Sequence, residues 1–183
     1  LEVLHQRERK RVAVFTDRYF AFSLEQEPFH REPVPKSGNL QSINASFYEM
    51  MRSHGFESKP YWHLMLTPSS ARNVARLLFD RPREECPDAI VVADDNLTDE
   101  IIAGLIDAGV TATDDLIIVN HCNWPAQNYP MLPTIGVGFD IRDFIRCCLG
   151  TIIAIQRGDS VPKVQLLSAQ KQPSEVRAVQ EPS

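Results

Sequence analysis

The chain has 183 residues, of which 43% are hydrophobic and 23% charged, and its 19 basic and 24 acidic side chains leave a net charge of -5. This composition is typical of a globular protein with a substantial buried core, and the negative balance gives no electrostatic reason to expect a nucleic-acid surface in this chain. No apolar run approaches the length that crosses a bilayer, and the first residues lack a signal-peptide pattern, so we predict no membrane contact and a cytoplasmic location.

The first third of the chain predicts a helix, a strand, a long loop, a second helix and a second strand. Residues 1–9 have the pattern of the last turns of a helix and residues 11–15 that of a strand, so the sequence opens inside an α/β fold and we expect a fragment. From 17 to 40, prolines among charged residues predict a long loop insertion. A helix that ends near Gly55 and a strand over 61–66 follow.

The next two predicted helices have marked ends. Thr67-Pro68 has the form of an N-cap followed by a first-turn proline. The later helix has Asn96 or Thr98 as its N-cap and stops at Gly109.

Two continuous apolar runs, 89–93 and 116–119, flank this later helix. Such runs are typical of strands that are covered on both faces, so the segment predicts a parallel βαβ unit. The polar residues after each strand would lie at the carboxyl edge of the sheet, where open α/β sheets bind ligands.

The last third of the chain predicts a loop over 123–133, a short strand over 134–137 and a long helix with an apolar stripe over 141–153. A final strand over 162–168 precedes a tail over 169–183 that has too few apolar residues to pack well.

The cysteines and histidines show no pattern of a metal site or of a disulfide framework. No CxxC pair occurs, and the five histidines have no zinc-type spacing to a cysteine. Cys147 and Cys148 are adjacent on a predicted helix and point in different directions. We therefore predict no metal and no cofactor, and a reducing environment for the four cysteines.

These segments in this order resemble the C-terminal part of the effector-sensing core of LacI/GalR-type transcription regulators, which has the type I periplasmic-binding-protein fold. The resemblance begins with LEVLHQRERKRVAVF, is clearest over PDAIVVADDNLTDEIIAGLIDAGVTATDDLIIVNH, and continues through YPMLPTIGVGFDIRDFIRCCLGTIIAIQRGD to the final strand. It implies an α/β fold with a parallel sheet in three αβα layers.

The resemblance also implies that residues 1–168 are a fragment of a core with two subdomains. Residues 12–130 would form mainly the second subdomain, and 134–159 would return to the first subdomain. The strand over 162–168 would then cross back. The DNA-binding helix-turn-helix would lie upstream of Leu1.

The positions that hold the effector in this family carry different residues here. The family's Asn-Asp pair after a strand falls on Asp94-Asp95, and the aspartate that ends the next strand falls on Cys122. The cleft arginine and the glycine after it fall near Ile43 and Ser46. Because sugar recognition depends on charged hydrogen-bonding groups, these changes weaken the prediction of a simple sugar and are compatible with an unusual effector, or with none.

The candidate effector-binding residues are Asp94, Asp95, His121, Cys122, Asn123 and Trp124. Each also has a structural interpretation. The two carboxylates could cap the helix that follows them. His121 and Cys122 would point to opposite faces of a strand and so could not form a catalytic dyad. Trp124 and Tyr129 could stack on an effector or simply cover the loop.

The function implied by the resemblance is the ligand-sensing and dimerisation part of a bacterial transcription regulator, not an enzyme. Its partners would be a small-molecule effector, a sugar or another metabolite, and a second copy of the chain, with DNA bound only through the upstream domain. The implied dimer contacts are Leu97, Ile101, Leu105 and Tyr129. The alternatives are a secreted solute-binding protein of the same fold, and a small α/β enzyme whose catalytic constellation the sequence does not reveal.

Overall fold

A computed structural model describes residues 1–17, 51–111, 116–125 and 131–172. The predicted loop over 17–40 lies outside these residues apart from its first position, as do Ile43, Ser46 and Tyr129. The strands lie in the order β2 (His63–Leu66), β1 (Val12–Asp17), β3 (Ala89–Val92), β4 (Ile117–Trp124), β5 (Ile135–Asp140) and β6 (Gln170–Lys171). The chain divides into two units: unit 1 is Leu1–Asn120 with Pro130–Thr134, and unit 2 is His121–Tyr129 with Ile135–Ser183.

Unit 1 has a parallel sheet made of β2 (His63–Leu66), β1 (Val12–Asp17), β3 (Ala89–Val92) and the first half of β4 (Ile117–Trp124). The pairings of β1 with β2, of β1 with β3 and of β3 with β4 are all parallel. The predicted βαβ unit is therefore confirmed. Strand β2 begins later than predicted, because Pro60–Trp62 forms a short 3-10 turn.

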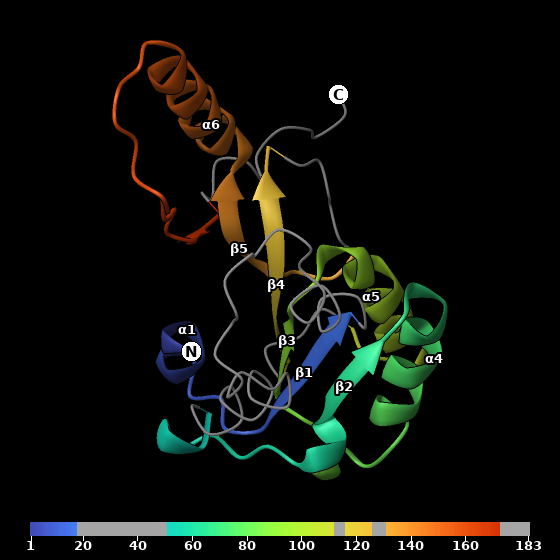
Figure 1. The fold of residues 1–183 in the computed structure, drawn as a ribbon. Helices are drawn as coiled ribbons and strands as arrows, with labels where there is room; N and C mark the ends of the chain where they lie inside the picture. Colours follow the sequence, from blue (N-terminus) through green and yellow to red (C-terminus); the bar gives the residue numbers. More distant parts are fainter. Residues whose placement is uncertain (18–50, 112–115, 126–130, 173–183) are drawn as a thin grey trace, which may run out of the picture. The chain divides into compact units, whose positions relative to one another are not determined.

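Helices cover both faces of this sheet (Figure 1). On one face, α4 (Pro68–Phe79) and α5 (Thr98–Asp107) pack on Ala13 and Phe15 of β1. On the other face, α1 (Glu2–Gln6) contributes Leu4 to a second cluster with alternate residues of β1. The alternation of side chains along β1 thus supplies two cores, and unit 1 has three αβα layers as predicted.

Local chemistry explains where these helices begin and end. Thr67 is the N-cap of α4 with Pro68 in the first turn, and the backbone N–H of Thr67 donates to Ser70 Oγ at 3.1 Å. Helix α5 ends before Gly109, whose φ of 78° suits a glycine, and Val110 N donates to Leu105 O at 2.9 Å.

The beginning of α5 differs from the prediction. Its N-cap position is Leu97, so neither Asn96 nor Thr98 caps it, and Thr98 is its first residue. Asp94 instead caps a short 3-10 turn over Asp95–Leu97, since its Oδ1 accepts from the backbone N–H of Asn96 at 2.9 Å. The chain therefore turns once before the helix starts.

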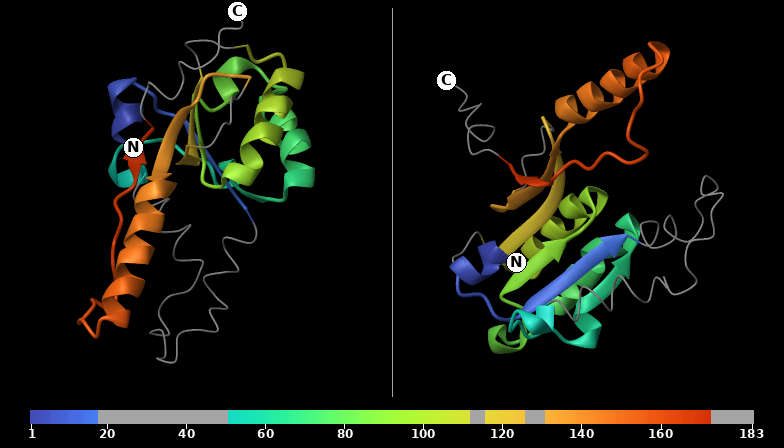
Figure 2. Two further views of the ribbon diagram at one scale, coloured as in Figure 1. Left: turned by 90° about the horizontal axis from the view of Figure 1, so that it is seen from above. Right: turned by 60° about the vertical axis from the view of Figure 1, so that its left-hand side comes forward.

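Unit 2 contains the second half of β4, then β5 (Ile135–Asp140), α6 (Ile141–Gln156) and β6 (Gln170–Lys171). Figure 2 shows α6 following β5 and the chain returning to β6, which pairs antiparallel with β5. The final strand predicted over 162–168 is wrong, because that segment has no strand and pairing begins only at Gln170.

Helix α6 is amphipathic but has no buried residue. Its large apolar side chains are between 40% and 58% exposed, and they are Ile141, Phe144, Ile145, Leu149, Ile152, Ile153 and Ile155. An apolar surface of this extent normally marks a face that packs against something else. No helix in the described part of the chain is long and apolar enough to cross a membrane.

Candidate functional site

Strand β4 continues four residues into unit 2, where a loop was predicted from residue 123 onward. Its burial alternates along this stretch: Cys122 and Trp124 are buried, whereas His121 and Asn123 are partly exposed. His121 and Cys122 therefore point to opposite faces of the strand, as the sequence predicted for this pair. The candidate residues of β4 therefore form an inward pair, Cys122 and Trp124, and an outward pair, His121 and Asn123.

The outward pair lines a cavity of about 530 Å³ that lies within unit 2. The other walls come from the end of β5, the first turn of α6 and the segment that returns after α6. The described residues that line it are His121, Asn123, Phe139, Ile141, Phe144, Gln165 and Leu167. We call this space the β4–α6 cavity. Its volume is that of an ordinary small-molecule site, about 300–1,000 Å³.

Two glycines hold β5 close to the backbone of β4. A Cβ placed on Gly138 would lie 2.7 Å from the carbonyl carbon of Cys122, and one placed on Gly136 would lie 2.5 Å from Cys122 Sγ. Side chains at these positions would push the strands apart. Because Phe139 directly follows Gly138 on β5, its backbone lies close to β4.

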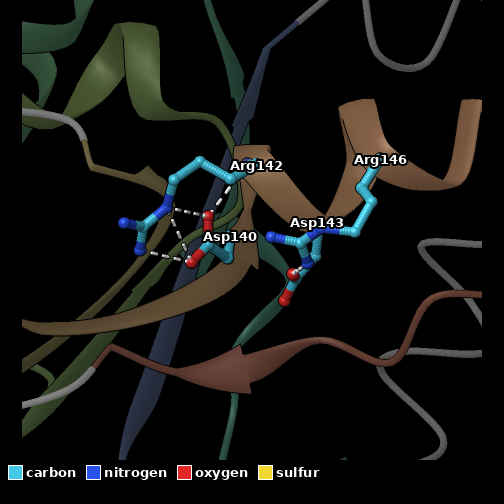
Figure 3. A network of polar contacts seen from close by, with 4 residues as sticks. All are labelled: Asp140, Arg142, Asp143 and Arg146. Carbon is cyan, nitrogen blue, oxygen red and sulfur yellow. Dashed lines mark hydrogen bonds and ion pairs between the residues drawn. The ribbon is translucent and has the colours of Figure 1, made fainter. Parts of the chain in front are cut away.

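The first turn of α6 carries charges that pair with one another (Figure 3). Asp140 caps the helix by accepting from the backbone N–H of Arg142 at 2.9 Å, and the Arg142 guanidinium donates to both carboxylate oxygens. This hydrogen bonding lowers the pKa of Asp140 to about 2. The Arg146 guanidinium donates to one carboxylate oxygen of Asp143.

Cys122 and Trp124 do not line the cavity. The Cys122 thiol donates to Gln172 Oε1 at 3.7 Å, next to Gly136, and Trp124 is 3% exposed. Asp94 and Asp95 belong to unit 1, where both are partly exposed and Asp94 forms the cap described above. The capping role that the sequence left open for the carboxylates is thus real for Asp94, on the 3-10 turn.

The three described residues expected at a dimer contact are buried. Leu97, Ile101 and Leu105 are completely inaccessible and belong to the core cluster beneath α4 and α5. The expectation that they present a contact surface is therefore corrected, because they form the inward stripe of the amphipathic helix. Its outward side includes Ile106, which is 36% exposed.

One serine and one histidine of unit 1 lie within hydrogen-bonding distance. Ser58 Oγ is 2.8 Å from His63 Nε2, and it donates to the carbonyl oxygen of Val12 at 2.7 Å. Since the single hydroxyl proton goes to the carbonyl, the serine accepts from His63 and is not activated as a nucleophile. Burial lowers the pKa of His63, which favours this neutral ring.

Sequence reasoning missed Phe139, Gln165 and the glycine pair as parts of a site. Residues 141–153 were predicted as a packing stripe, and 162–168 as a strand. The signal that could have found Phe139 is its place at the carboxyl end of β5, directly before a helix-capping aspartate. In the described part of the chain, no group of three or more acidic, histidine or cysteine side chains is placed to hold a metal ion.

Comparison of this fold with solved structures finds LacI-family regulators. A regulatory protein of the LacI family from Chloroflexus aggregans is 21% identical, with a TM-score of 0.68 over 93% of this chain and 56% of that chain. A LacI family transcriptional regulator from Lactobacillus casei with bound sucrose is 15% identical, with a TM-score of 0.67 over 94% and 58%. A dimeric Lac repressor that lacks 11 C-terminal residues is 13% identical, with a TM-score of 0.67 over 93% and 56%.

No protein-family model and no curated protein matches the sequence. The similarity thus lies in the fold, which has the predicted periplasmic-binding-protein-like α/β class with a mixed, mostly parallel sheet. The chain has the fold of the LacI-family regulators over nearly all of its own length, and it spans 56 to 58% of theirs.

Proposed function

We propose that this chain is the ligand-sensing and self-associating part of a LacI-type bacterial transcription regulator that works in the cytoplasm. The observation that carries the proposal is the fold, which matches such regulators over 93 to 94% of the chain. The β4–α6 cavity supports it, because two residues singled out from the sequence, His121 and Asn123, line a space of suitable size.

The regulator from Lactobacillus casei holds sucrose, so this fold accepts a small polar molecule. In this chain the effector would contact the outward residues of β4. Binding would favour one of two arrangements of the sensing core and so change the affinity of an upstream helix-turn-helix for DNA. As part of the same proposal, Asp94 and Asp95 would also contact the effector.

The exposed face of α6 supports the subdomain arrangement that the resemblance implies. A helix with seven large apolar side chains and no buried residue lacks the layer that would cover it. We assign that layer to the part of the regulator that corresponds to the unmatched length of the solved chains. Residues 134–159 would then belong to the first subdomain, and 12–130 mainly to the second.

The proposal excludes an enzymatic role for the Ser58–His63 pair. The serine proton is donated to Val12 O, so the histidine does not act as its base. A role in holding the segment before β2 against the first residue of β1 accounts for both contacts.

We also propose that the chain forms a homodimer, as does the Lac repressor of similar fold. Because the inward stripe of α5 is buried, the contact would use its outward side with Ile106. Sedimentation over a wide concentration range tests this. The change Ile106→Asp should weaken self-association, whereas Met131→Ser, at a residue that is 81% exposed, should leave it unchanged. Equal sedimentation of the wild type and both variants as monomers would refute the dimer.

The sensing role is tested by calorimetry of the purified protein, as its gene encodes it, against a panel of metabolites. We expect at least one to bind, and Asn123→Ala to weaken that binding. Val164→Ala is the matched control, because Val164 is 72% exposed and does not line the cavity. If no metabolite binds, or if both variants lose binding equally, the proposed site is wrong.

A further inference from the structure

We draw no further inference here: the strongest candidate, the cavity of about 470 Å³ in unit 1 between the end of α1 and the turn at Gly55, carries nothing, because its basic side chains Arg9 and Lys10 follow the carboxyl end of α1, where positive charge is favoured without a ligand, and nothing in the described residues shows what would bind there.

Discussion

The packing of α4 against α5 depends on Gly104, and replacing this residue by alanine is expected to destabilise unit 1. A Cβ at this position would lie 2.9 Å from Ala75 Cβ and 3.0 Å from the carbonyl carbon of Arg72, with the Arg72 carbonyl oxygen nearer still. Ordinary carbon contacts are about 3.5–4.0 Å. The new methyl group would therefore push the two helices apart by roughly 0.5–1 Å.

Two opposing effects set the magnitude of this change. Alanine in a helix is favoured over glycine by about 0.5–1 kcal/mol. Overpacking costs about 1–3 kcal/mol, and the cost here belongs at the upper end because the obstructing atoms are backbone atoms. The net expectation for Gly104→Ala is a loss of about 2 kcal/mol in the free energy of unfolding, which moves a urea midpoint down by about 1 M.

Urea unfolding followed by tryptophan fluorescence measures this loss. In a Trp124→Phe background the signal comes from Trp62, which is completely buried in unit 1. The matched control is Gly150→Ala in α6, where a Cβ would meet no atom within 4 Å. We expect the control to be neutral or slightly stabilising. If Gly104→Ala is as stable as the wild type, the close contact between the helices is refuted.

Three further predictions concern titrating groups. Asp140 should titrate near pH 2 in a nuclear magnetic resonance titration, and Arg142→Gln should return its pKa toward 3.8; an unchanged pKa in the variant would contradict the pairing. The Asp107 pKa is likewise lowered by its hydrogen bonds to Arg72, so the stability that this pair supplies should be lost as pH falls through the lowered pKa, and Arg72→Gln should remove that dependence. Because burial lowers the pKa of His63, the unfolded chain binds more protons near pH 6, and stability should fall as pH drops below 6.5, by at most about 1.4 kcal/mol per pH unit for one proton. The change His63→Gln should flatten this part of the curve, and an identical pH profile in the variant would exclude His63 as the cause.

The fold of unit 1 was predictable because its signals are local. Apolar runs with β-branched residues gave the strands β1 and β3, and Thr67-Pro68 and Gly109 gave two helix boundaries that the structure confirms. These signals depend on the backbone of a few neighbouring residues. They therefore hold even where the rest of the chain is not considered.

The errors occur where the outcome depends on distant parts of the chain. Asn123 is polar and suggested a loop, but β4 continues through it because the close approach of β5 at Gly138 provides a neighbouring strand. The apolar segment over 162–168 suggested a strand, yet Leu166 is 90% exposed and the polar pair Gln170-Lys171 makes the pairing. An apolar sequence pattern indicates that a segment favours burial. It does not show whether another part of the fold covers that segment.

The candidate site shows the same division. Alternation along β4 correctly separated His121 from Cys122, since side chains of a strand alternate in direction. Phe139, Phe144 and Gln165 could not be predicted as cavity walls, because their place depends on how β5, α6 and the segment after α6 meet. The prediction that Leu97, Ile101 and Leu105 form a dimer contact was wrong for a related reason. A position carried over from a resemblance does not show whether its side chain faces inward.

The central proposal is that a small molecule bound by this chain changes the DNA affinity of the whole protein. The most direct test is the fluorescence anisotropy of labelled promoter DNA from upstream of its gene, titrated with the protein as that gene encodes it, with and without a metabolite that calorimetry shows to bind. The account predicts that the metabolite changes the DNA affinity by about 5–150-fold and that DNA changes the metabolite affinity by the same factor. A DNA affinity that no bound metabolite alters, or the absence of specific DNA binding, would contradict the account.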